Sequence, residues 1–399
     1  MAFTFTLDDV AFLASPGGRD AVAELTATGR TGDPLRDAAS ARARLGDRGA
    51  AVLETVLLRE RARGRVPDGW LLTADALEQA TTAPVAAHRA VRLRGRDVHD
   101  LTCSVGAELA ALRPLARRLV GSDLDPVRLA MARHNLPDVP LVRADALAPV
   151  TRDAVLVADP ARRTATGRRV LRPSAFTPAL DALADAAGRQ RGGAAGVQRQ
   201  ESPPLARDLV VSTAPGLDPA LVPWAAEVEL VSLDGRVREA ALWSAGLATA
   251  RRRATVLSSS AAPWELTDAD DDTCPVRPVG QWLVDPDGAV VRAGLVRHLA
   301  ARHGLGQLDE RLAYLTGDTP PPGLRAFRVV EEGRWSEKAL RQTLRRRGVG
   351  RAEILVRGLD VDPAVLRPRL RLSGRAAAVV VLARVGSGAR AYVCEPPTG

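Results

Sequence analysis

The sequence predicts an α/β protein in which a mostly parallel sheet has helices on both faces. A helical domain precedes this sheet and α+β domains follow it. Strand-like apolar segments alternate with helix-like segments between residues 97 and 246, and such alternation is typical of a doubly wound parallel sheet. Before residue 97 the apolar residues follow only helical spacing. After residue 324 the predicted elements follow the order β, α, β, α, β, β. A chain of 399 residues is long enough for several domains.

Residues 1–92 are expected to form the helical domain. Their apolar residues recur every three or four positions, and Gly, Pro and Asp interrupt the pattern. The helix-like segments are DAVAELTA, LRDAASARARL, AAVLETVLLRERARG and ALEQATTAPVAAHRAVRLR.

Residues 93–247 are expected to form the sheet. The strand-like segments are VHDLTC, LVGSD, PLVRAD, AVLVADP, DLVVSTAP, EVELVS and EAALWS, and the helix-like segments are GAELAALRPLARR, PVRLAMARHN and PALDALADAA. The turn LDGR joins the last two strands and favours an antiparallel hairpin. Residues 188–204 are polar and rich in glycine, so they are expected to form a loop.

Residues 248–323 and 324–399 are expected to form two small α+β domains, the first of them ferredoxin-like. In the first, ATVLSS and QWLVDP look like strands, VRAGLVRHLAARHG and LDERLAYL look like helices, and GDTPPPG is a linker. In the second, the order of elements suits two helices that cover one face of a sheet.

The net positive charge lies at the C-terminal end. The whole chain has a net charge of +9, and residues 325–399 contain 16 basic and 7 acidic residues, which accounts for all of it. Binding to a phosphate backbone requires a local basic excess, because neutralised phosphates release counterions. A basic face that contacts only solvent is the alternative. The densest basic run, Arg345-Arg346-Arg347, ends a predicted helix, where cations also favour the helix dipole.

Cysteine and histidine usage favours a reducing compartment and no metal site. Cys103, Cys274 and Cys394 are too scattered for a disulfide framework or a thiolate metal site, and His298 and His303 have no matching ligands. The first residues carry acids where a signal peptide needs basic residues, and no apolar run approaches the length of a membrane helix. A cytoplasmic protein with no membrane partner is therefore expected.

The stretch VHDLTCSVGAELAAL at residues 98–112 looks like a strand, a loop of small residues and a helix. The start of such a helix can receive a negatively charged group. A dinucleotide fold would require G-x-G-x-x-G here, and only Gly106 is present, so NAD and FAD are disfavoured. A cofactor that ends in an amino-acid carboxylate and ammonium needs less room, and Asp100 at the end of the strand is placed to pair with the ammonium.

Acidic residues follow the next three predicted strands as well. Asp123 is suited to accept hydrogen bonds from both ribose hydroxyls of a nucleotide, although a helix cap explains it equally well on its own. Asp145 is suited to accept from the exocyclic amine of adenine. Asp159 begins the segment DPARR, at the edge where an open parallel sheet binds its ligands. Four successive strand ends with acids are difficult to explain by capping alone.

These strand ends resemble the successive motifs of the class I S-adenosylmethionine-dependent methyltransferases, with a Rossmann-like sheet. The strings LEQATTAPVAAHRA, DLTCSVGAEL, GSDLDP, VADPARR, STAPGLD, LDGRVREAALW and VVRAGLVRHLA resemble, more closely, a bacterial family of such enzymes with a THUMP-like C-terminal domain. The resemblance implies that S-adenosylmethionine is the cofactor and that RNA, either tRNA or rRNA, is the partner. It implies a cofactor site made of Asp100, Thr102, Gly106, Asp123, Leu124, Asp145 and Ala146, and an acceptor-facing catalytic segment made of Asp159, Pro160, Ala161 and Arg162.

Two positions depart from the pattern of that family. Ser104 stands where a small glycine is common, so the sequence leaves open whether cofactor binding is weakened. Enzymes that methylate an exocyclic amine often have a Pro and then an aromatic residue where this chain has Ala161 and Arg162. The guanidinium of Arg162 could replace the aromatic ring by stacking on a base, or could bind a phosphate. Base N-methylation is the leading interpretation.

Other reactions are disfavoured or remain as alternatives. A cysteine nucleophile is disfavoured because Cys103 is better explained as a packing residue and Cys274 follows an acidic run. A small-molecule methyltransferase would show no salt-dependent RNA binding. A non-catalytic RNA-binding protein with a relic cofactor pocket would not bind S-adenosylmethionine. Arg345, Arg346 and Arg347 are the predicted RNA contacts.

Overall fold

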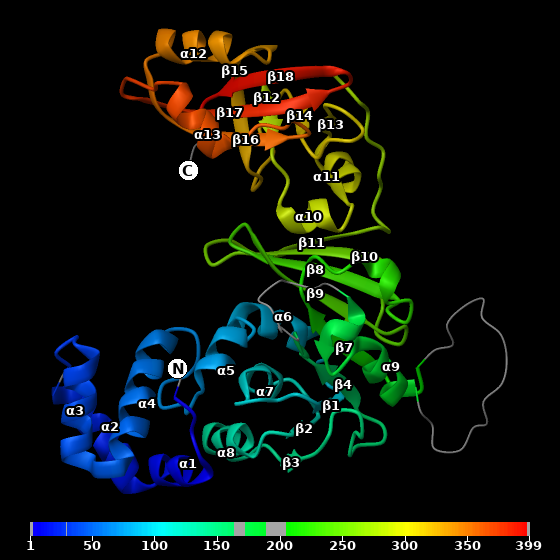
Figure 1. Ribbon diagram of the computed structural model, residues 1–399. Helices are drawn as coiled ribbons and strands as arrows, with labels where there is room; N and C mark the ends of the chain where they lie inside the picture. The colour runs from blue at the N-terminus through cyan, green and yellow to red at the C-terminus, as the bar shows by residue number, and fades with distance from the viewer. Residues whose placement is uncertain (1–2, 29, 163–171, 189–204, 397–399) are drawn as a thin grey trace. The chain divides into compact units, whose positions relative to one another are not determined.

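A computed structural model describes residues 3–28, 30–162, 172–188 and 205–396 (Figure 1). The chain divides into two compact units. Unit 1 comprises Met1–Val228 and Arg238–Thr249, and unit 2 comprises Glu229–Val237 and Ala250–Gly399. Most of the loop predicted at residues 188–204 lies outside the described residues. Within the described part of the chain, no helix is both long and apolar enough to cross a membrane.

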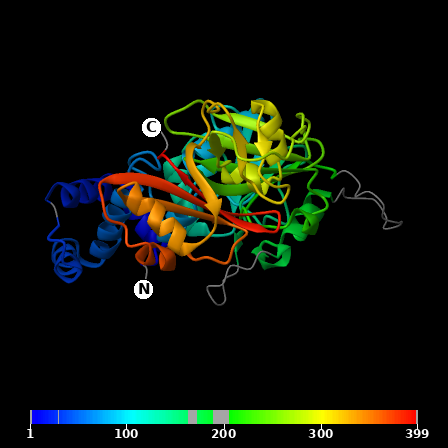
Figure 2. The same cartoon turned by 90° about the horizontal axis from the view of Figure 1, so that it is seen from above.

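Unit 1 begins with a cluster of helices, which confirms the helical N-terminus. A capping box between Thr6 and Asp9 starts the first helix, and the side chain of Asp33 caps the third. The helices lie at the end of unit 1 opposite α9 (Leu180–Gly188) (Figures 1 and 2). They are α1 (Leu7–Ala14), α2 (Pro16–Thr28), α3 (Pro34–Leu45) and α4 (Gly49–Ala62).

The next helical segment is broken into two pieces that the sequence pattern alone did not separate. Helix α5 (Ala74–Gln79) ends at Ala80, and α6 (Ala83–Arg92) starts after Thr82 with Pro84 in its first turn. The break lies before Pro84 because a proline inside a helix has no N–H to donate and clashes with the preceding turn, whereas the first turn of a helix tolerates it. The short connection between α5 and α6 lines the pockets described below.

The sheet of unit 1 has the strand order β9-β7-β4-β1-β2-β3. Strands β3, β2, β1, β4 and β7 are parallel, and β9 runs antiparallel to β7. The register pairs Asp100 with Gly121 and with Val157, so the carboxyl ends of β1, β2 and β4 meet at one edge. The bounds are β1 (Asp97–Asp100), β2 (Arg118–Asp123), β3 (Leu141–Arg143), β4 (Val155–Ala158), β7 (Leu209–Thr213) and β9 (Arg236–Trp243).

Helices cover both faces of this sheet, as predicted. The core on one face contains residues of α8 (Pro126–Asn135) and of the N-terminal helices. On the other face, Ala90 and Leu93 from the end of α6 pack with residues of β1, β4 and β7. Helix α7 (Ala107–Leu112) contributes to both cores, through Leu109 and Leu112. The order of the strands reverses between β1 and β4, which is where open sheets of this kind bind ligands.

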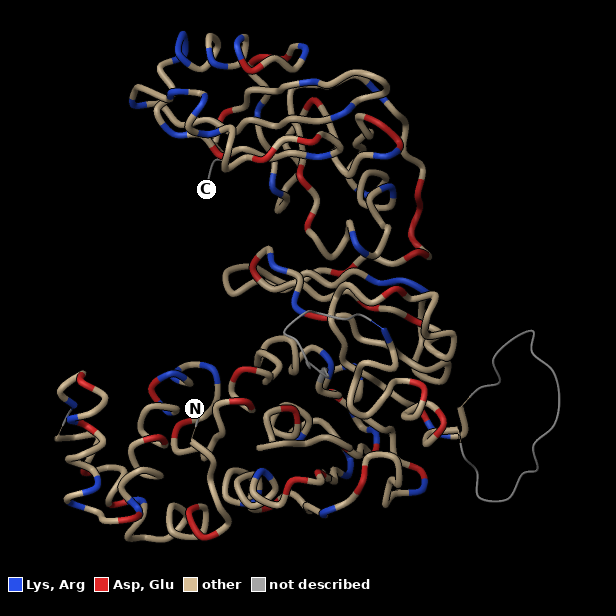
Figure 3. Tube along the Cα trace, viewed as in Figure 1, with Lys and Arg blue, Asp and Glu red and all other residues tan. Residues whose placement is uncertain are grey.

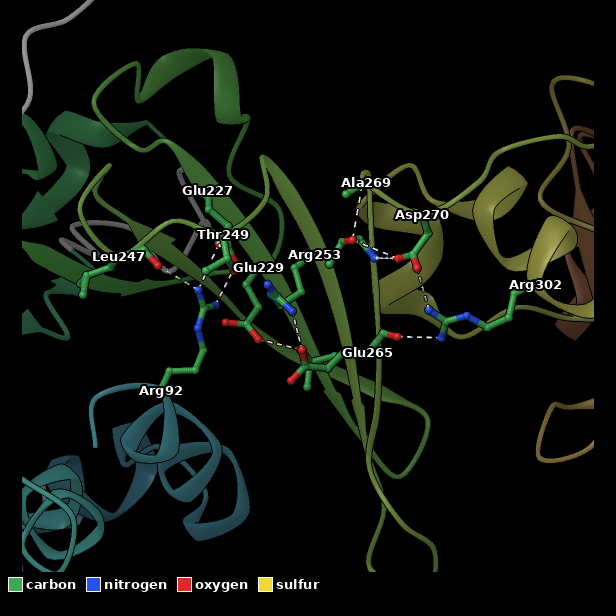
Figure 4. Close-up of polar contacts among 12 residues, drawn as sticks. Arg92, Glu227, Glu229, Leu247, Thr249, Arg253, Glu265, Ala269, Asp270 and Arg302 are labelled. Atoms are coloured by element: carbon green, nitrogen blue, oxygen red, sulfur yellow. Dashed lines mark hydrogen bonds and ion pairs between the residues drawn. The ribbon is translucent and has the colours of Figure 1, made fainter. Parts of the chain in front are cut away.

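The segment of the predicted hairpin comprises β8 (Glu227–Leu233), a two-residue connection and β9. Asp234 and Gly235 form its turn with φ values of 51° and 72°, as a type I′ turn requires. The division between the two units falls within this hairpin. In unit 1, Glu227 is fully buried and binds Arg92 at 2.8 Å and the amide of Thr249 at 2.8 Å (Figure 4).

Unit 2 contains β8, β10 (Arg252–Leu257) and β11 (Trp264–Thr267) and a separate seven-stranded sheet. The larger sheet has the order β13-β14-β12-β15-β18-β17-β16. Its strands are β12 (Trp282–Val284), β13 (Gly306–Gln307), β14 (Leu315–Gly317), β15 (Ala326–Arg334), β16 (Val349–Arg357), β17 (Ala376–Val385) and β18 (Gly388–Cys394). The helices are α10 (Gly288–Arg292), α11 (Val296–His303), α12 (Glu337–Arg346) and α13 (Pro363–Arg369).

The predicted order of elements after residue 324 is confirmed. Leu340 and Leu344 of α12 and Leu366 of α13 share one core with alternate residues of β17, so both helices lie on the same face of the sheet. Strand β12 pairs with β15, so residues on both sides of the predicted boundary at 323 contribute to one sheet. The bounds of the four predicted domains stay predictions.

One predicted helix is wrong. Residues 308–315 form a turn that leads into β14, with Leu312 donating to the carbonyl of Asp309 at 3.0 Å. Tyr314 is buried, and Leu315 pairs with Val284 of β12. Leu308, Leu312 and Tyr314 of this segment are buried in the core beside the larger sheet of unit 2. Tertiary packing therefore overrides the helical spacing of the segment.

Candidate active site

The loop after β1 is held close to the two neighbouring strands. The amide of Leu101 donates to the carbonyl of Val157 at 2.8 Å, and the amide of Cys103 donates to the carbonyl of Ser122 at 2.9 Å. Gly106 has a φ of 98°, and a Cβ there would lie 2.8 Å from Cδ1 of Leu136. Glycine is therefore required at this position both for its backbone conformation and for its lack of a side chain.

Ser104 also adopts a left-handed backbone conformation, with a φ of 49°. This explains why a glycine is common at its place in related loops, since only glycine enters that region without a steric cost. The Ser104 amide donates to Oδ2 of Asp123 at 2.9 Å. That charge-assisted hydrogen bond offsets the cost of the strained backbone.

Asp123 at the end of β2 lies beside the β1 loop. Its Oδ1 accepts from the amide of Asp125 at 2.9 Å, in addition to the bond from Ser104 to Oδ2. The cap of α8 is Asp125, whose Oδ1 accepts from the amides of Val127 and Arg128. The helix-cap alternative for Asp123 is therefore wrong. Each of its oxygens keeps a lone pair that could accept from a ligand hydroxyl.

Asp100 at the end of β1 is 2% exposed and lacks a full set of partners. Its Oδ1 accepts from the amide of Thr102 at 3.1 Å, and its buried Oδ2 accepts no hydrogen bond from the described residues. Burial, and then the nearby charge of Glu108, raise the pKa of Asp100 well above its usual range. A buried acid of this kind fits a cationic partner, such as an ammonium group, which would restore the lost solvation.

Thr102 connects the β1 loop to the end of β4. Its hydroxyl accepts a hydrogen bond from the amide of Asp159 at 2.8 Å. After Asp159 and Pro160, the short strand β5 (Ala161–Arg162) pairs with β6 (Phe176–Thr177), which holds this segment against the pocket. The side chain of Arg162 lies outside the described part of the structure.

A pocket at this sheet edge brings together most of the predicted cofactor residues. Six of the seven line it, and the seventh, Gly106, shapes the loop beside them. Of the acceptor-facing segment, Asp159 and Ala161 line this pocket and Pro160 lines the next one. Asp145 accepts from the amide of Leu147 at 2.9 Å. The six predicted cofactor residues that line this pocket are Asp100, Thr102, Asp123, Leu124, Asp145 and Ala146.

A buried ion network beside this pocket was missed by the sequence reasoning. Arg89 of α6 is 1% exposed and binds both oxygens of Glu239 at 2.7 and 2.9 Å. Its Nη1 donates to the hydroxyl of Ser212, and its Nε lies 3.5 Å from Oε1 of Glu108. An arginine within the apolar stripe of PVAAHRAV was the available sequence signal.

Glu108 lines the same pocket from the first turn of α7. Its burial raises its pKa to about 7, although the charge of Arg89 opposes this shift. Oε1 of Glu108 is buried and forms no hydrogen bond within the described residues. Together with Asp100, Asp123 and Asp159, Glu108 makes the lining strongly acidic. An acidic lining suits a ligand that carries positive charge.

A second pocket adjoins the first and has part of its wall in common with it. The shared residues are Gln79, Ala80, Thr81, Asp159 and Ala161. The second pocket is also lined by Arg65, Glu78, Thr82, Val85, Pro160, Phe176, Ser212, Thr213, Ala214, Arg238 and Glu239. All the residues of both pockets belong to unit 1.

Neither Cys103 nor His99, which lie near the end of β1, is placed as a nucleophile or as part of a metal-binding group within the described residues. Burial raises the pKa of the Cys103 thiol, so the thiol stays protonated. His99 is buried between Thr151 and Ser122, and burial lowers its pKa to about 4. Among the residues described, no group of three or more His, Cys, Asp or Glu side chains could hold a metal ion.

The predicted RNA contacts Arg345, Arg346 and Arg347 lie at the end of α12, where Lys and Arg positions gather (Figure 3). Arg346 binds Glu331 at 2.7 Å, and Arg347 binds the same carboxylate at 3.3 Å. Arg345 is exposed and has no carboxylate partner in the described part of the chain. Of the three, Arg345 is therefore the most available for an external phosphate.

Comparisons with known proteins agree with this fold and site. A family model described as THUMP domain-like matches residues 324–396, and a domain of unknown function matches residues 6–62. Two relatives from Mycobacterium tuberculosis, strains CDC 1551 / Oshkosh and ATCC 25618 / H37Rv, are both named uncharacterized S-adenosylmethionine-dependent methyltransferases. Each is 52% identical over 376 residues, which is 89% of this chain and 99% of the relative.

A solved structure from Porphyromonas gingivalis W83, described as a methyltransferase, has the same fold with a TM-score of 0.73. It is 18% identical and covers 99% of this chain and 100% of its own. The order of the parallel strands and the two 52%-identical relatives together define a class I S-adenosylmethionine-dependent methyltransferase. The chain belongs to the family of S-adenosylmethionine-dependent methyltransferases that includes the two mycobacterial relatives, with a THUMP-like domain at its C-terminal end.

Proposed function

We propose that this methyltransferase modifies an exocyclic amine on a base of structured RNA, either tRNA or rRNA, in the cytoplasm. The observation that carries the proposal is the position of Asp159, which lies in the wall between the two pockets and is anchored by Thr102. A carboxylate there can accept a hydrogen bond from an amine that faces the cofactor. The THUMP-like match and the basic excess of the same region support RNA as the acceptor.

The residues of the first pocket are proposed to hold the cofactor in an extended arrangement along the sheet edge. Asp100 pairs with the ammonium group, because its buried Oδ2 has no hydrogen bond from the described residues. Asp123 accepts from the ribose hydroxyls, and Asp145 accepts from the adenine amine. Thr102, Leu124 and Ala146 shape the walls, while Gly106 lets the loop approach closely.

The chemistry needs positioning more than acid or base strength. When bound, S-adenosylmethionine supplies an electrophilic methyl group whose carbon–sulfur electron pair stays on the sulfur as the acceptor nitrogen forms the new bond. Asp159 orients the nitrogen lone pair by accepting one N–H, and the proton that the nitrogen loses passes to this carboxylate or to water. Pro160 and Ala161 keep water away from the transfer path.

Arg162 and the α12 arginines are proposed to contact the RNA. Arg162 follows Ala161 where related enzymes often place an aromatic ring, and a guanidinium plane can stack on a base. Arg345 contacts phosphate directly, whereas Arg346 and Arg347 would first have to leave Glu331.

Nucleoside mass spectrometry of total RNA from wild-type and deletion cells tests the proposal. A methylated nucleoside should disappear on deletion, return with the wild-type gene, and stay absent with Asp159→Ala. An unchanged nucleoside spectrum, together with methylation of a small metabolite by the purified enzyme, would show that the acceptor is a small molecule instead.

A further inference from the structure

The second pocket has a polar, buried floor and a charged rim, where Arg65, Arg238, Glu78 and Asp159 are exposed. Its floor contains Ser212, Thr213 and Glu239, which are 3%, 7% and 6% exposed. Arg65 and Arg238 line the same pocket but are exposed, so they lie at its rim. A ligand that fills this pocket should therefore carry hydrogen-bond donors at one end and negative charge at the other.

Glu239 at the floor is held in one orientation. Both of its oxygens accept from Nη2 of Arg89, and the hydroxyl of Ser212 lies within 3.5 Å of Oε2. Oε2 therefore already faces two donors, which fixes the plane of the carboxylate. A rigidly placed buried carboxylate favours a ligand that presents an N–H group over one that presents a lone pair, because the lone pair would face negative charge.

The two arginines at the rim are positioned and have no acidic partner. Nη2 of Arg65 donates to the carbonyl of Leu77 at 2.8 Å, which fixes the guanidinium next to the connection between α5 and α6. Neither Arg65 nor Arg238 pairs with a carboxylate among the described residues, whereas Glu78 of the same lining binds Arg61. Guanidinium groups at such positions match the geometry of a phosphate.

The position of the second pocket fits the acceptor of the methyl group. It shares Asp159, Ala161 and the residues Gln79 to Thr81 with the cofactor pocket. Arg89 bridges Glu108 in the first lining and Glu239 in the second, so the wall between the pockets is rigid and charged. A ligand in the second pocket therefore lies directly beside the cofactor, as direct transfer of a methyl group requires.

We propose that this second pocket takes one nucleotide of the RNA, extruded from its helix, with the base at Asp159 and Glu239 and its phosphate at Arg65 and Arg238. This inference rests on the proposed function and adds the recognition residues of the acceptor. Extrusion is needed because the target atom of a stacked base cannot reach a pocket of this depth. Glu239 would then select bases that present an N–H donor beside the amine that is methylated.

The test uses the full-length enzyme and total RNA from cells that lack its gene. Methyl transfer is measured for wild type, Arg65→Gln, Arg238→Gln and Glu239→Gln, with Arg63→Gln and Arg236→Gln as matched controls outside both pockets. Each rim variant should raise the KM for RNA about tenfold and change kcat less than twofold, because one charge-assisted hydrogen bond is lost. Calorimetry should give the wild-type affinity for S-adenosylmethionine in every variant, which also establishes that each one folds.

A second readout separates recognition of phosphate from general stability. Nucleoside monophosphates should inhibit RNA methylation by the wild type at about a tenth of the concentration that the matching nucleosides require. The rim variants should abolish that difference, and the controls should keep it. Glu239→Gln should lower kcat/KM about tenfold while the advantage of the monophosphates persists, because the phosphate contacts are intact.

Two negative results have different meanings. If the wild type methylates RNA and both rim variants behave like the controls, the nucleotide assignment is wrong and the proposed function stands. If the wild type binds S-adenosylmethionine but transfers no methyl group to RNA, the proposed function is wrong and the nucleotide assignment is lost with it.

Discussion

The hydroxyl of Thr102 accepts a hydrogen bond from the backbone amide of Asp159 at 2.8 Å. This bond joins the loop that follows β1 to the residue that follows β4, so it fixes the proposed cofactor side of the site relative to the proposed acceptor side. Thr102→Val should lower kcat about tenfold and the free energy of unfolding by about 1 kcal/mol. Thr102→Ser keeps the hydroxyl and should stay within twofold of wild type; equal kcat values for the two variants would contradict this role.

Asp100→Asn should weaken the binding of S-adenosylmethionine and stabilise the free enzyme at neutral pH. The raised pKa of Asp100 means that its contribution to stability is present below its unfolded value, near 3.8, and is lost as the pH rises through the folded value. The Asp100→Asn variant carries no ionisable group at this position, so its stability should not fall for this reason as the pH rises. Calorimetry for the cofactor and Tm for the free enzyme check the two effects. Tighter cofactor binding by the variant would contradict the assigned pairing with the ammonium group.

Glu108 should make stability depend on pH in a defined window. Because burial raises its pKa from 4.5 to about 7, its protonated form favours the folded state and its contribution falls as the pH rises from about 4.5 through 7. Glu108→Gln should flatten the profile of Tm against pH in that window. A profile as steep as that of the wild type would show that other groups are responsible.

Ser104 should tolerate glycine and reject β-branched residues. Its φ of 49° lies in the left-handed region, where a β-branched side chain is a steric outlier. Ser104→Val should reduce the free energy of unfolding by about 1–2 kcal/mol. Ser104→Gly should bind S-adenosylmethionine within twofold of wild type in calorimetry. A loss of affinity in the glycine variant would show that the hydroxyl itself contacts the cofactor.

Arg92 should be far more important for stability than an exposed arginine with equally good geometry. It binds fully buried Glu227 at 2.8 Å and lies 3.7 Å from the ring centroid of Trp243. Arg92→Ala should cost about 3–5 kcal/mol, since it leaves a buried carboxylate without its main cation. Arg113 binds Asp138 at 2.7 Å with both side chains 51% exposed, and Arg113→Ala should cost about 0.5 kcal/mol or less. Urea unfolding of both variants measures this difference.

The α12 arginines should differ in their effect on RNA binding. Arg345→Gln should reduce the slope of log affinity against log salt concentration by about 1, because one phosphate contact is lost. Arg346→Gln should change it less, since Arg346 already binds Glu331. Filter binding of total RNA at several salt concentrations measures the slopes. Equal reductions in the two variants would show that Glu331 releases Arg346 when RNA binds.

Much of the fold and of the cofactor pocket could be predicted from local patterns. Alternation of strands and helices implied the parallel sheet, and parallel strands end at one edge. Acids that follow successive strands, such as Asp100, Asp123 and Asp159, were therefore expected to meet, and the structure places them in one pocket. The order of elements after residue 324 followed from the same reasoning.

The sequence by itself thus determined the class of fold, the sheet edge at which the acidic residues meet and the position of the loop glycine Gly106, because each depends on spacing along a short segment. Only the tertiary structure decided which distant side chains meet. Arg89 and Glu239 are 150 positions apart, and Arg346 meets Glu331 across two elements. It also decided that residues 308–315 form a turn that leads into β14 and that Ser104 has a left-handed backbone conformation. Such outcomes depend on packing against other segments, which no local spacing records.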